Sequence, residues 1–276
     1  MRVRLPSGAR FSRDAWLLIA ASCIFSVSFY GVHNLLRVLY VLRLGHGPEY
    51  VGVFGASSAL TYMGMGLPSG ALGQRFGARG VMLVGSVIMV IGMIALPLVE
   101  FLPASFGILW PIATQIFMTA GWSMVNVSII PGLMAATTPE ERSGVYAANG
   151  AVRSLGTFAG TIVGGLLPGL FGGIIGRTLD APDPYRYALW VAAAITVTAI
   201  APIALLRIAR PAPPAARVGG ADAFPMGTMA VLLSHVALVH GSWATLQAFG
   251  NAYMDTDLLL PASIIGLITG AAQLVA

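Results

Sequence analysis

The stretch from Ala15 to Leu36 reads AWLLIAASCIFSVSFYGVHNLL, which is 22 residues without a single charged side chain. As an α-helix this stretch would be about 33 Å long, because each residue adds about 1.5 Å. That length crosses the hydrocarbon core of a bilayer, which requires about 20 apolar residues. The stretch is longer than the apolar part of a signal peptide and contains no small-residue cleavage site. We therefore interpret it as a retained membrane span.

The composition of the whole chain indicates that further spans follow. Of its 276 residues, 57% are hydrophobic and only 9% are charged, whereas a soluble domain carries about 25% charged residues. These proportions exclude a soluble globular enzyme, a coiled coil and a disordered chain, and the missing Gly-X-Y period excludes collagen. The sequence therefore predicts an all-α fold, a polytopic transmembrane helical bundle with the lipid bilayer as its first partner.

Charged residues divide the chain into eight expected spans. They lie at about 15–36 (extending to 41), 50–72, 80–99, 105–135, 144–171, 187–206, 226–251 and from 258 to the apolar end at 276. A segment rich in Pro, Ala and Arg follows the sixth span and is the best candidate for a linker. We therefore expect a six-helix bundle over residues 1–208 and a cytoplasmic linker over 209–224. Residues 225–276 would then be the first two helices of a second bundle, which would make the chain a fragment.

The basic residues predict the orientation of the chain in the membrane. All 15 are arginines, and they are spread between the apolar blocks, which argues against a nucleic-acid partner. Ten arginines fall in the tails and loops on the N-terminal side of the membrane, and three fall in the opposite loops. By the positive-inside rule we expect a multi-pass protein of the cell (inner) membrane with a cytoplasmic N-terminus.

Signatures of catalytic and cofactor chemistry are missing from the sequence. Cys23 is the only cysteine, so neither a disulfide framework nor a cysteine metal site can form. The chain has no G-x-S-x-G, H-E-x-x-H, Walker or Rossmann pattern. We expect no enzyme activity, no cofactor and no metal site.

A glycine- and arginine-rich loop connects the second and third spans. It reads Gly70-Ala-Leu72-Gly-Gln74-Arg75-Phe-Gly77-Ala-Arg79. The loop resembles the cytoplasmic loop motif of the major facilitator superfamily, G-x-L-a-D-R-x-G-R-[RK], in its residues and in its position after the second span. Gln74 replaces the acidic residue that helps latch the family's cytoplasmic gate, so only a weaker, uncharged hydrogen bond is expected there. The segment 138–142 and the linker also fall where the family has its next cytoplasmic loop and its inter-bundle connection.

The resemblance implies a function. It would make the chain spans one to eight of a twelve-helix secondary active transporter that moves a small solute by alternating access. The cytoplasmic gate would then contain Gly70, Leu72, Gln74, Arg75, Gly77 and Arg79. The alternatives are a non-transporting membrane protein that keeps the bundle for sensing or assembly, and an inactive fragment. The sequence leaves the solute and the coupling ion open, and a proton is one candidate for that ion.

Two further patterns bear on the resemblance. A weak internal repeat fits two homologous halves, because Tyr40-Val-Leu-Arg43 before Pro48 is echoed by Tyr253-Met-Asp255 before Pro261, although apolar sequences also match by chance. The family's antiporter motifs are incomplete, since Phe117 and Thr161 replace their arginine and proline. The glycines that the second motif retains, at positions 156, 160, 164 and 165, are also what close helix packing requires.

Polar residues recur at helical spacing inside the spans. Ser26, Tyr30, His33 and Arg37 are spaced to share one face of the first span, and the fourth, fifth and seventh spans carry similar stripes. In the resembled family these spans contribute to the central cavity. The candidate substrate-binding residues are therefore Tyr30, His33, Asn34, Gln115, Trp122, Asn126, Asn149, Arg153, His240, Gln247 and Asn251.

Most of these residues also have a structural explanation. Ser, Thr and Asn stripes can form hydrogen bonds between helices, worth about 0.6 kcal/mol each. His33 can be a satisfied buried imidazole, and Arg37 can reach the outer interface with its charged end. Arg153 cannot easily reach an interface, so we expect it to act in binding or gating. The seven complete spans contain no acidic residue, which leaves His33, His240 or a carboxylate in the expected further helices as proton carrier. The same absence favours an anionic or polar solute at Arg153.

Overall fold

The computed structural model describes residues 11–208, 227, 231, 234–235 and 249–275. The first long helix runs from Arg13 to Arg43 in three parts, which are α1 (Arg13–Phe25), the π-helical η1 (Ser26–His33) and α2 (Asn34–Arg43). The other elements are α3 (Pro48–Phe76), α4 (Ala78–Ala95), η2 (Leu96–Phe101), η3 (Ala104–Phe106), α5 (Leu109–Ala135), α6 (Arg142–Ile175), α7 (Asp183–Thr198), α8 (Ile200–Ala204) and α10 (Ala262–Val275). Residues 249–256 are also helical. Every regular element in these ranges is a helix, which confirms the expected all-α bundle.

Helices long and apolar enough to cross a membrane account for most of the expected spans. They are Arg13–Arg43, Ala78–Phe101, Leu109–Ala135, Arg142–Ile175 and Asp183–Ala204, which makes the chain a multi-pass membrane protein. The second expected span is α3, which is 29 residues long but is not among these five. It is less apolar because glycine and serine recur along it. The linker over 209–224 and most of the seventh expected span lie outside the described residues.

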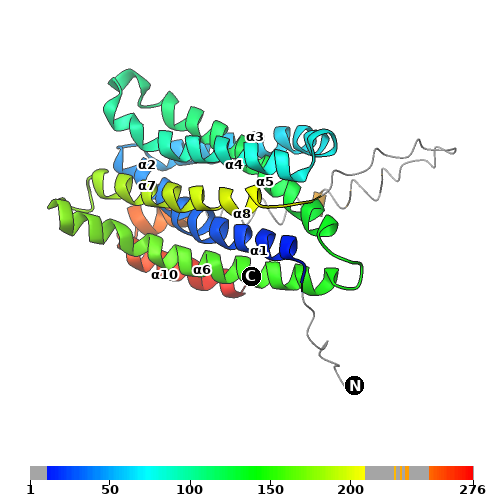
Figure 1. Cartoon of the computed structure of the whole chain (residues 1–276). Helices are drawn as coiled ribbons and strands as arrows, with labels where there is room; N and C mark the ends of the chain where they lie inside the picture. Colours follow the sequence, from blue (N-terminus) through cyan, green and yellow to red (C-terminus); the bar gives the residue numbers. More distant parts are fainter. Residues whose placement is uncertain (1–10, 209–226, 228–230, 232–233, 236–248, 276) are drawn as a thin grey trace.

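The helices lie side by side along one common direction (Figure 1). Helices α3 and α4 lie on one side of the bundle and α6 and α10 on the other, with the first long helix and α7 between them. Helix α5 packs against α3 and α4, and α6 packs against η1 and α10. Loops therefore lie at two opposite ends. We call them the motif end, which carries Gly77 and the start of α1, and the far end, which carries Arg43 and the start of α7.

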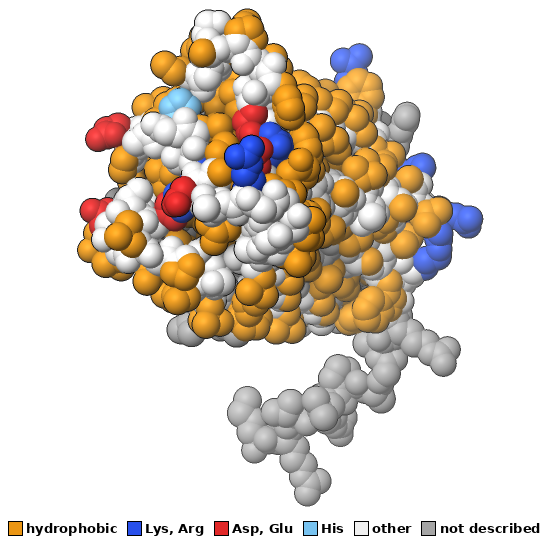
Figure 2. Space-filling view, turned by 90° about the vertical axis from the view of Figure 1, so that its left-hand side faces the viewer, with side chains coloured by type: hydrophobic (Ala, Val, Ile, Leu, Met, Phe, Trp, Pro, Cys, Tyr) orange, Lys and Arg blue, Asp and Glu red, His pale blue; other side chains and the backbone are white. Residues whose placement is uncertain are grey.

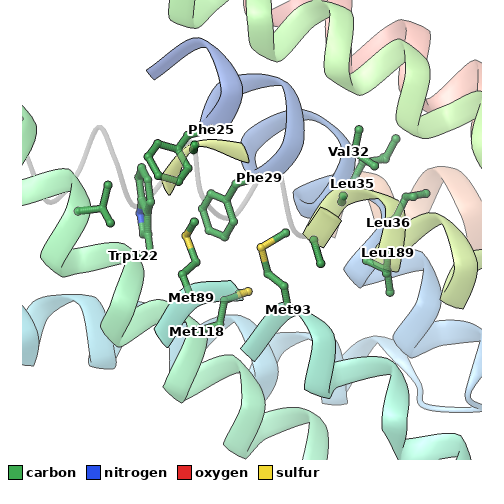
Figure 3. Packing of buried hydrophobic residues seen from close by; sticks show 14 of the residues in the cluster. Phe25, Phe29, Val32, Leu35, Leu36, Met89, Met93, Met118, Trp122 and Leu189 are labelled. Atoms are coloured by element: carbon green, nitrogen blue, oxygen red, sulfur yellow. The ribbon is translucent and has the colours of Figure 1, made fainter. Parts of the chain in front are cut away.

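Aromatic and methionine side chains fill the centre of the bundle. The side chains that meet there come from the first long helix, α4 and α5, and include Phe25, Phe29, Met89, Met93, Met118 and Trp122 (Figure 3). The rings of Phe29 and Trp122 stack with centroids 4.8 Å apart. Lipid tails are as apolar as this core, so the helices associate through close packing rather than through hydrophobic burial. Trp122 thus holds α5 against the first helix.

Glycines let α6 approach its two neighbours closely. A methyl group added to Gly160 would overlap the carbonyl oxygen of Val27 in η1. One added to Gly165 would lie 2.6 Å from the carbonyl oxygen of Ala262 in α10. The glycines that resemble part of an antiporter motif therefore serve helix packing, as small residues commonly do between membrane helices.

Candidate functional site

A group of polar side chains lies at mid-height of the bundle. Trp122 is the central residue of α5, and Tyr62 is the central residue of α3. Tyr30 lies in η1, near the middle of the first long helix. Because these helices span the bundle from end to end, residues at their centres lie near the middle of the membrane. Polar groups at that depth are costly and commonly functional.

Arg153 of α6 and Tyr30 of η1 form the centre of this group. Nη2 of Arg153 donates a hydrogen bond of 2.8 Å to the hydroxyl oxygen of Tyr30. The guanidinium carbon lies 5.2 Å from the centroid of the same ring, which in turn meets Trp122 edge-on at 4.8 Å. Arg153 lies about 16 Å along α6 from its first residue, at 1.5 Å per residue. The guanidinium is therefore held at mid-height, as the sequence predicts for this residue.

A second polar contact lies one helical turn away on α5. Nδ2 of Asn126 donates a hydrogen bond of 2.6 Å to the hydroxyl oxygen of Tyr62. Asn126 and Trp122 are four residues apart, so they lie on the same side of α5. The mid-height group therefore contains Tyr30, Tyr62, Trp122, Asn126 and Arg153, and it draws on η1, α3, α5 and α6. Tyr62 is not among the substrate-binding residues that the sequence predicts. The low hydropathy of its span, α3, was a signal that could have indicated it.

The π-helical segment changes which residues of the first helix share a face. The predicted stripe of Ser26, Tyr30, His33 and Arg37 assumes 3.6 residues per turn, whereas a π-helix has i to i+5 hydrogen bonds and a wider turn. Ser26 and His33 are fully buried, while Tyr30, Asn34 and Arg37 are half-exposed. The prediction of one shared face is therefore wrong, because the wider turn moves the buried His33 away from the face of Tyr30.

Three candidate residues are buried with unused hydrogen-bonding atoms. Both ring nitrogens of His33, both amide atoms of Gln115 and Oδ1 of Asn149 have no hydrogen-bond partner among the described residues. The imidazole of His33 stacks on the ring of Phe29 at 5.9 Å. His33 is therefore not the satisfied buried imidazole that the sequence left as an alternative. An unpaired buried polar group costs about 1–3 kcal/mol.

The remaining candidates lie apart from the mid-height group or beyond the described residues. Oδ1 of Asn251 accepts a hydrogen bond of 3.0 Å from the hydroxyl of Thr269 in α10. His240 and Gln247 lie outside the described residues. Arg37 lies over the ring of Phe54, 6.0 Å from its centroid, and its Nε is buried without a partner in the described ranges.

Acidic and basic side chains gather at the far end (Figure 2). Arg43 at the end of α2 forms a bidentate ion pair with Asp255, with Nη1–Oδ2 at 2.6 Å and Nη2–Oδ1 at 2.7 Å. Nε of Arg43 also donates to the carbonyl oxygen of Leu179. The side chain of Asp255 is only 2% exposed. Arg43 thus links the first helix to the helical residues 249–256, a contact for which the internal repeat was the only sequence signal.

A second network of charges lies at the same end of the bundle. Arg186 of α7 donates hydrogen bonds to Glu100 of η2 and to Asp183. The hydroxyl of Tyr40 in α2 donates to the other carboxylate oxygen of Glu100 at 2.8 Å. These bonds join three helices and satisfy the acids locally. Within the described ranges, no three His, Cys, Asp or Glu side chains lie close enough together to hold a metal ion.

At the motif end, Gly77 alone joins α3 to α4. Its φ of 81° is a conformation that residues with a Cβ rarely adopt, so the turn requires glycine. Nη2 of Arg79 donates a hydrogen bond of 2.7 Å to the carbonyl oxygen of Ala204 at the end of α8. Gln74 and Arg75 are exposed, and Leu72 is half-buried. The motif thus contains both a turn and a contact to the last helix before the linker.

A cavity of about 380 Å³ lies between α3 and α5 at this end. Gly70 and Gln74 of the motif line it, together with Val127 and Ser128 of α5. Val127 directly follows Asn126 in the chain. The structure therefore places Gly70 and Gln74 of the motif beside a cavity between α3 and α5.

Comparisons with known proteins agree with this architecture. The family model of the Major Facilitator Superfamily matches residues 19–276. A solved structure, the crystal structure of a D-xylose-proton symporter, matches with a TM-score of 0.60 and 13% sequence identity. The match covers 95% of this chain and 65% of that protein, and at this identity it shows the fold alone. No curated protein sequence matches the chain.

Proposed function

This chain belongs to the major facilitator superfamily, and from that premise we propose that it carries a small solute across the membrane by alternating access, with the mid-height group as the solute site. A bundle over residues 1–208 and the helices that follow the linker at 209–224 rock about this group. The arginine-rich motif end faces the cytoplasm of a cell (inner) membrane, as the positive-inside rule requires.

The contact between Arg153 and Tyr30 is the observation that carries this proposal. It places a charged donor and a phenol at the level where transporters of this architecture hold their solutes. Nearby, Asn126 and Tyr62 add an amide and a second phenol from two further helices. A merely structural bundle has no need for a guanidinium at this depth, because the charge is costly there.

The two ends of the bundle differ in a way that fits one state of the transport cycle. At the far end the ion pair of Arg43 with Asp255 holds the first helix against residues 249–256. At the motif end a cavity lies beside Gln74 and Val127, the residue that follows Asn126. In this state the solute exchanges with the cytoplasm. Breaking the ion pair opens the far end, and closing the motif end completes the cycle.

Cysteine accessibility tests this proposal without knowledge of the solute. The full chain with Cys23→Ser and Asn34→Cys is placed in sealed vesicles, and a membrane-impermeant maleimide is added to either side. Asn34 is partly buried and lies four residues after Tyr30 in the first long helix. Alternating access predicts that the new thiol reacts with maleimide from both sides.

Val87→Cys in the same background is the matched control. Val87 is an exposed apolar residue near the middle of α4, so lipid should protect its thiol from both sides. Reaction of the Asn34→Cys thiol from one side only, under all conditions, would contradict alternating access and favour a sensing or assembly protein.

A further inference from the structure

We infer that the solute is a small organic anion, a carboxylate with an aromatic or other apolar body, and that Arg153 binds its carboxylate group. This inference rests on the proposed transport function and specifies the solute.

The interior of the described bundle carries positive charge without a matching negative charge. Arg37 and Arg153 lie inside the spans, and neither has a carboxylate within 4.0 Å among the described residues. Nine of the ten acidic residues of the sequence are described, and all nine lie at helix ends or in loops. The tenth, Asp222, belongs to the proline-rich segment outside the described residues. A guanidinium away from bulk water is costly unless a counterion accompanies it.

At the far end of the bundle, two largely buried arginines do have acidic partners. Arg43 pairs with Asp255, and Arg186 pairs with Glu100 and Asp183. Arg153 has instead the neutral hydroxyl of Tyr30. Arg153 thus shares with Arg37 the lack of an acidic partner among the described residues, and an anionic solute would supply the counterion that the mid-height group lacks.

The geometry leaves donors available for a carboxylate. A guanidinium has five N–H donors, and within the described ranges only Nη2 of Arg153 donates to a protein acceptor. The hydroxyl oxygen of Tyr30 accepts that bond, so its own proton is free to donate. Arg153 and Tyr30 can thus each donate to one carboxylate oxygen, which is the charge-assisted arrangement that binds carboxylates strongly.

The surroundings of these donors are aromatic. Trp122 meets the ring of Tyr30 edge-on at 4.8 Å, and Phe29 stacks on Trp122. The next polar contact, between Asn126 and Tyr62, lies one turn further along α5. A solute whose carboxylate lies on Arg153 therefore meets aromatic rings with its body, which favours an aromatic or apolar anion over a sugar or an inorganic ion.

Three probes of equal shape and different charge test the inference. Benzoate, benzamide and benzamidinium are titrated into the purified full chain in detergent, and binding is measured by isothermal titration calorimetry. We expect benzoate to bind at least tenfold more tightly than benzamide and benzamidinium not to bind. Arg153→Gln should remove the preference for benzoate, and Arg153→Lys should retain part of it because the charge remains.

Arg177→Gln is the matched control, because Arg177 is exposed just beyond the other end of α6. It should bind benzoate as the wild type does. Equal binding of benzamide, binding of benzamidinium, no binding of any probe, or benzoate binding that survives Arg153→Gln would each overturn the anion assignment. The accessibility of the Asn34→Cys thiol from both sides uses no solute, so it shows separately whether the proposed transport function stands.

Discussion

Arg43 and Asp255 form a bidentate ion pair although 212 residues separate them in the sequence. Both lie at the far end, where Arg43 closes the first helix and Asp255 lies near the end of the helical residues 249–256. They follow Tyr40 and Tyr253, the residues matched in the weak internal repeat, by three and two positions. The pair therefore joins the end of the first helix to the helical residues 249–256, with the carboxylate almost fully buried.

Asp255→Asn should weaken the contact that holds the first helix against residues 249–256 at the far end. Removing one partner of a buried pair leaves the other charge uncompensated, so we expect the free energy of unfolding to fall by about 3 kcal/mol. The Asn34→Cys thiol should then react faster with maleimide added at the far side. Thermal unfolding and labelling rates measure the two effects.

The neighbouring change Asp257→Asn serves as the control, because Asp257 is exposed and accepts, among the described residues, a side-chain hydrogen bond only from Thr256. The exchange Arg43→Asp with Asp255→Arg should restore part of the lost stability. An unchanged far-side labelling rate in Asp255→Asn would show that the pair does not close this end.

Tyr30→Phe should weaken benzoate binding about tenfold. The change keeps the ring that faces Arg153 but removes the hydroxyl, and a hydrogen bond to a charged group is worth about 1.5–3 kcal/mol. Tyr62→Phe removes a hydroxyl that bonds to Asn126 instead of Arg153, so it should change benzoate affinity much less. Equal losses in the two variants, measured by calorimetry, would contradict the specific role of Tyr30.

Gly160→Ala should destabilise the bundle by about 1–3 kcal/mol, which is the usual cost of overpacking. The added methyl group would overlap the backbone of Val27, so α6 and η1 would have to separate. Gly169→Ala on the same helix meets nothing within 4 Å. It should be neutral or slightly stabilising, because alanine favours helix over glycine by up to about 1 kcal/mol. Thermal unfolding of both variants in detergent tests the contrast.

His33→Leu should raise the stability of the protein by about 1–3 kcal/mol. The imidazole is fully buried and its nitrogens bond to none of the described residues. An apolar side chain of similar size therefore removes the free-energy cost of burying unpaired polar atoms. His46→Leu should give no gain, because His46 contacts the carbonyl oxygen of Gly107 and stacks on Tyr50. A lower melting temperature for His33→Leu would show that His33 has a partner beyond the described residues.

Hydropathy in the sequence was sufficient to locate the membrane helices. The fourth expected span, 105–135, corresponds to α5 at Leu109–Ala135, and the fifth, 144–171, corresponds to α6 at Arg142–Ile175. The loop motif likewise marked the turn at Gly77, where only glycine tolerates the backbone conformation. These features are local, since the thickness of the bilayer and the φ angle of one residue decide them.

The contacts of the candidate site could be predicted only in part. Arg153, Trp122 and Tyr30 were each found by asking which polar or aromatic residues lie inside spans. Tyr62 was missed. The prediction of which residues share a face of the first helix was wrong, because the residue spacing does not indicate a π-helical segment. The ion pair of Arg43 with Asp255 was also missed, because charges at the ends of spans resemble ordinary loop residues.

The sequence alone therefore determined that this protein is a bundle of membrane helices, which residues enter the bilayer and which end carries the motif. Only the tertiary structure decided that Arg153 meets Tyr30 and that Arg43 pairs with Asp255 at the far end. Transfer into lipid depends on the sum of side chains along one helix, which a sequence displays directly. Polar contacts between helices depend on how each helix is rotated and how closely it approaches its neighbour. That rotation and approach are set by a few close contacts, such as Gly160 against Val27, between residues far apart in the chain.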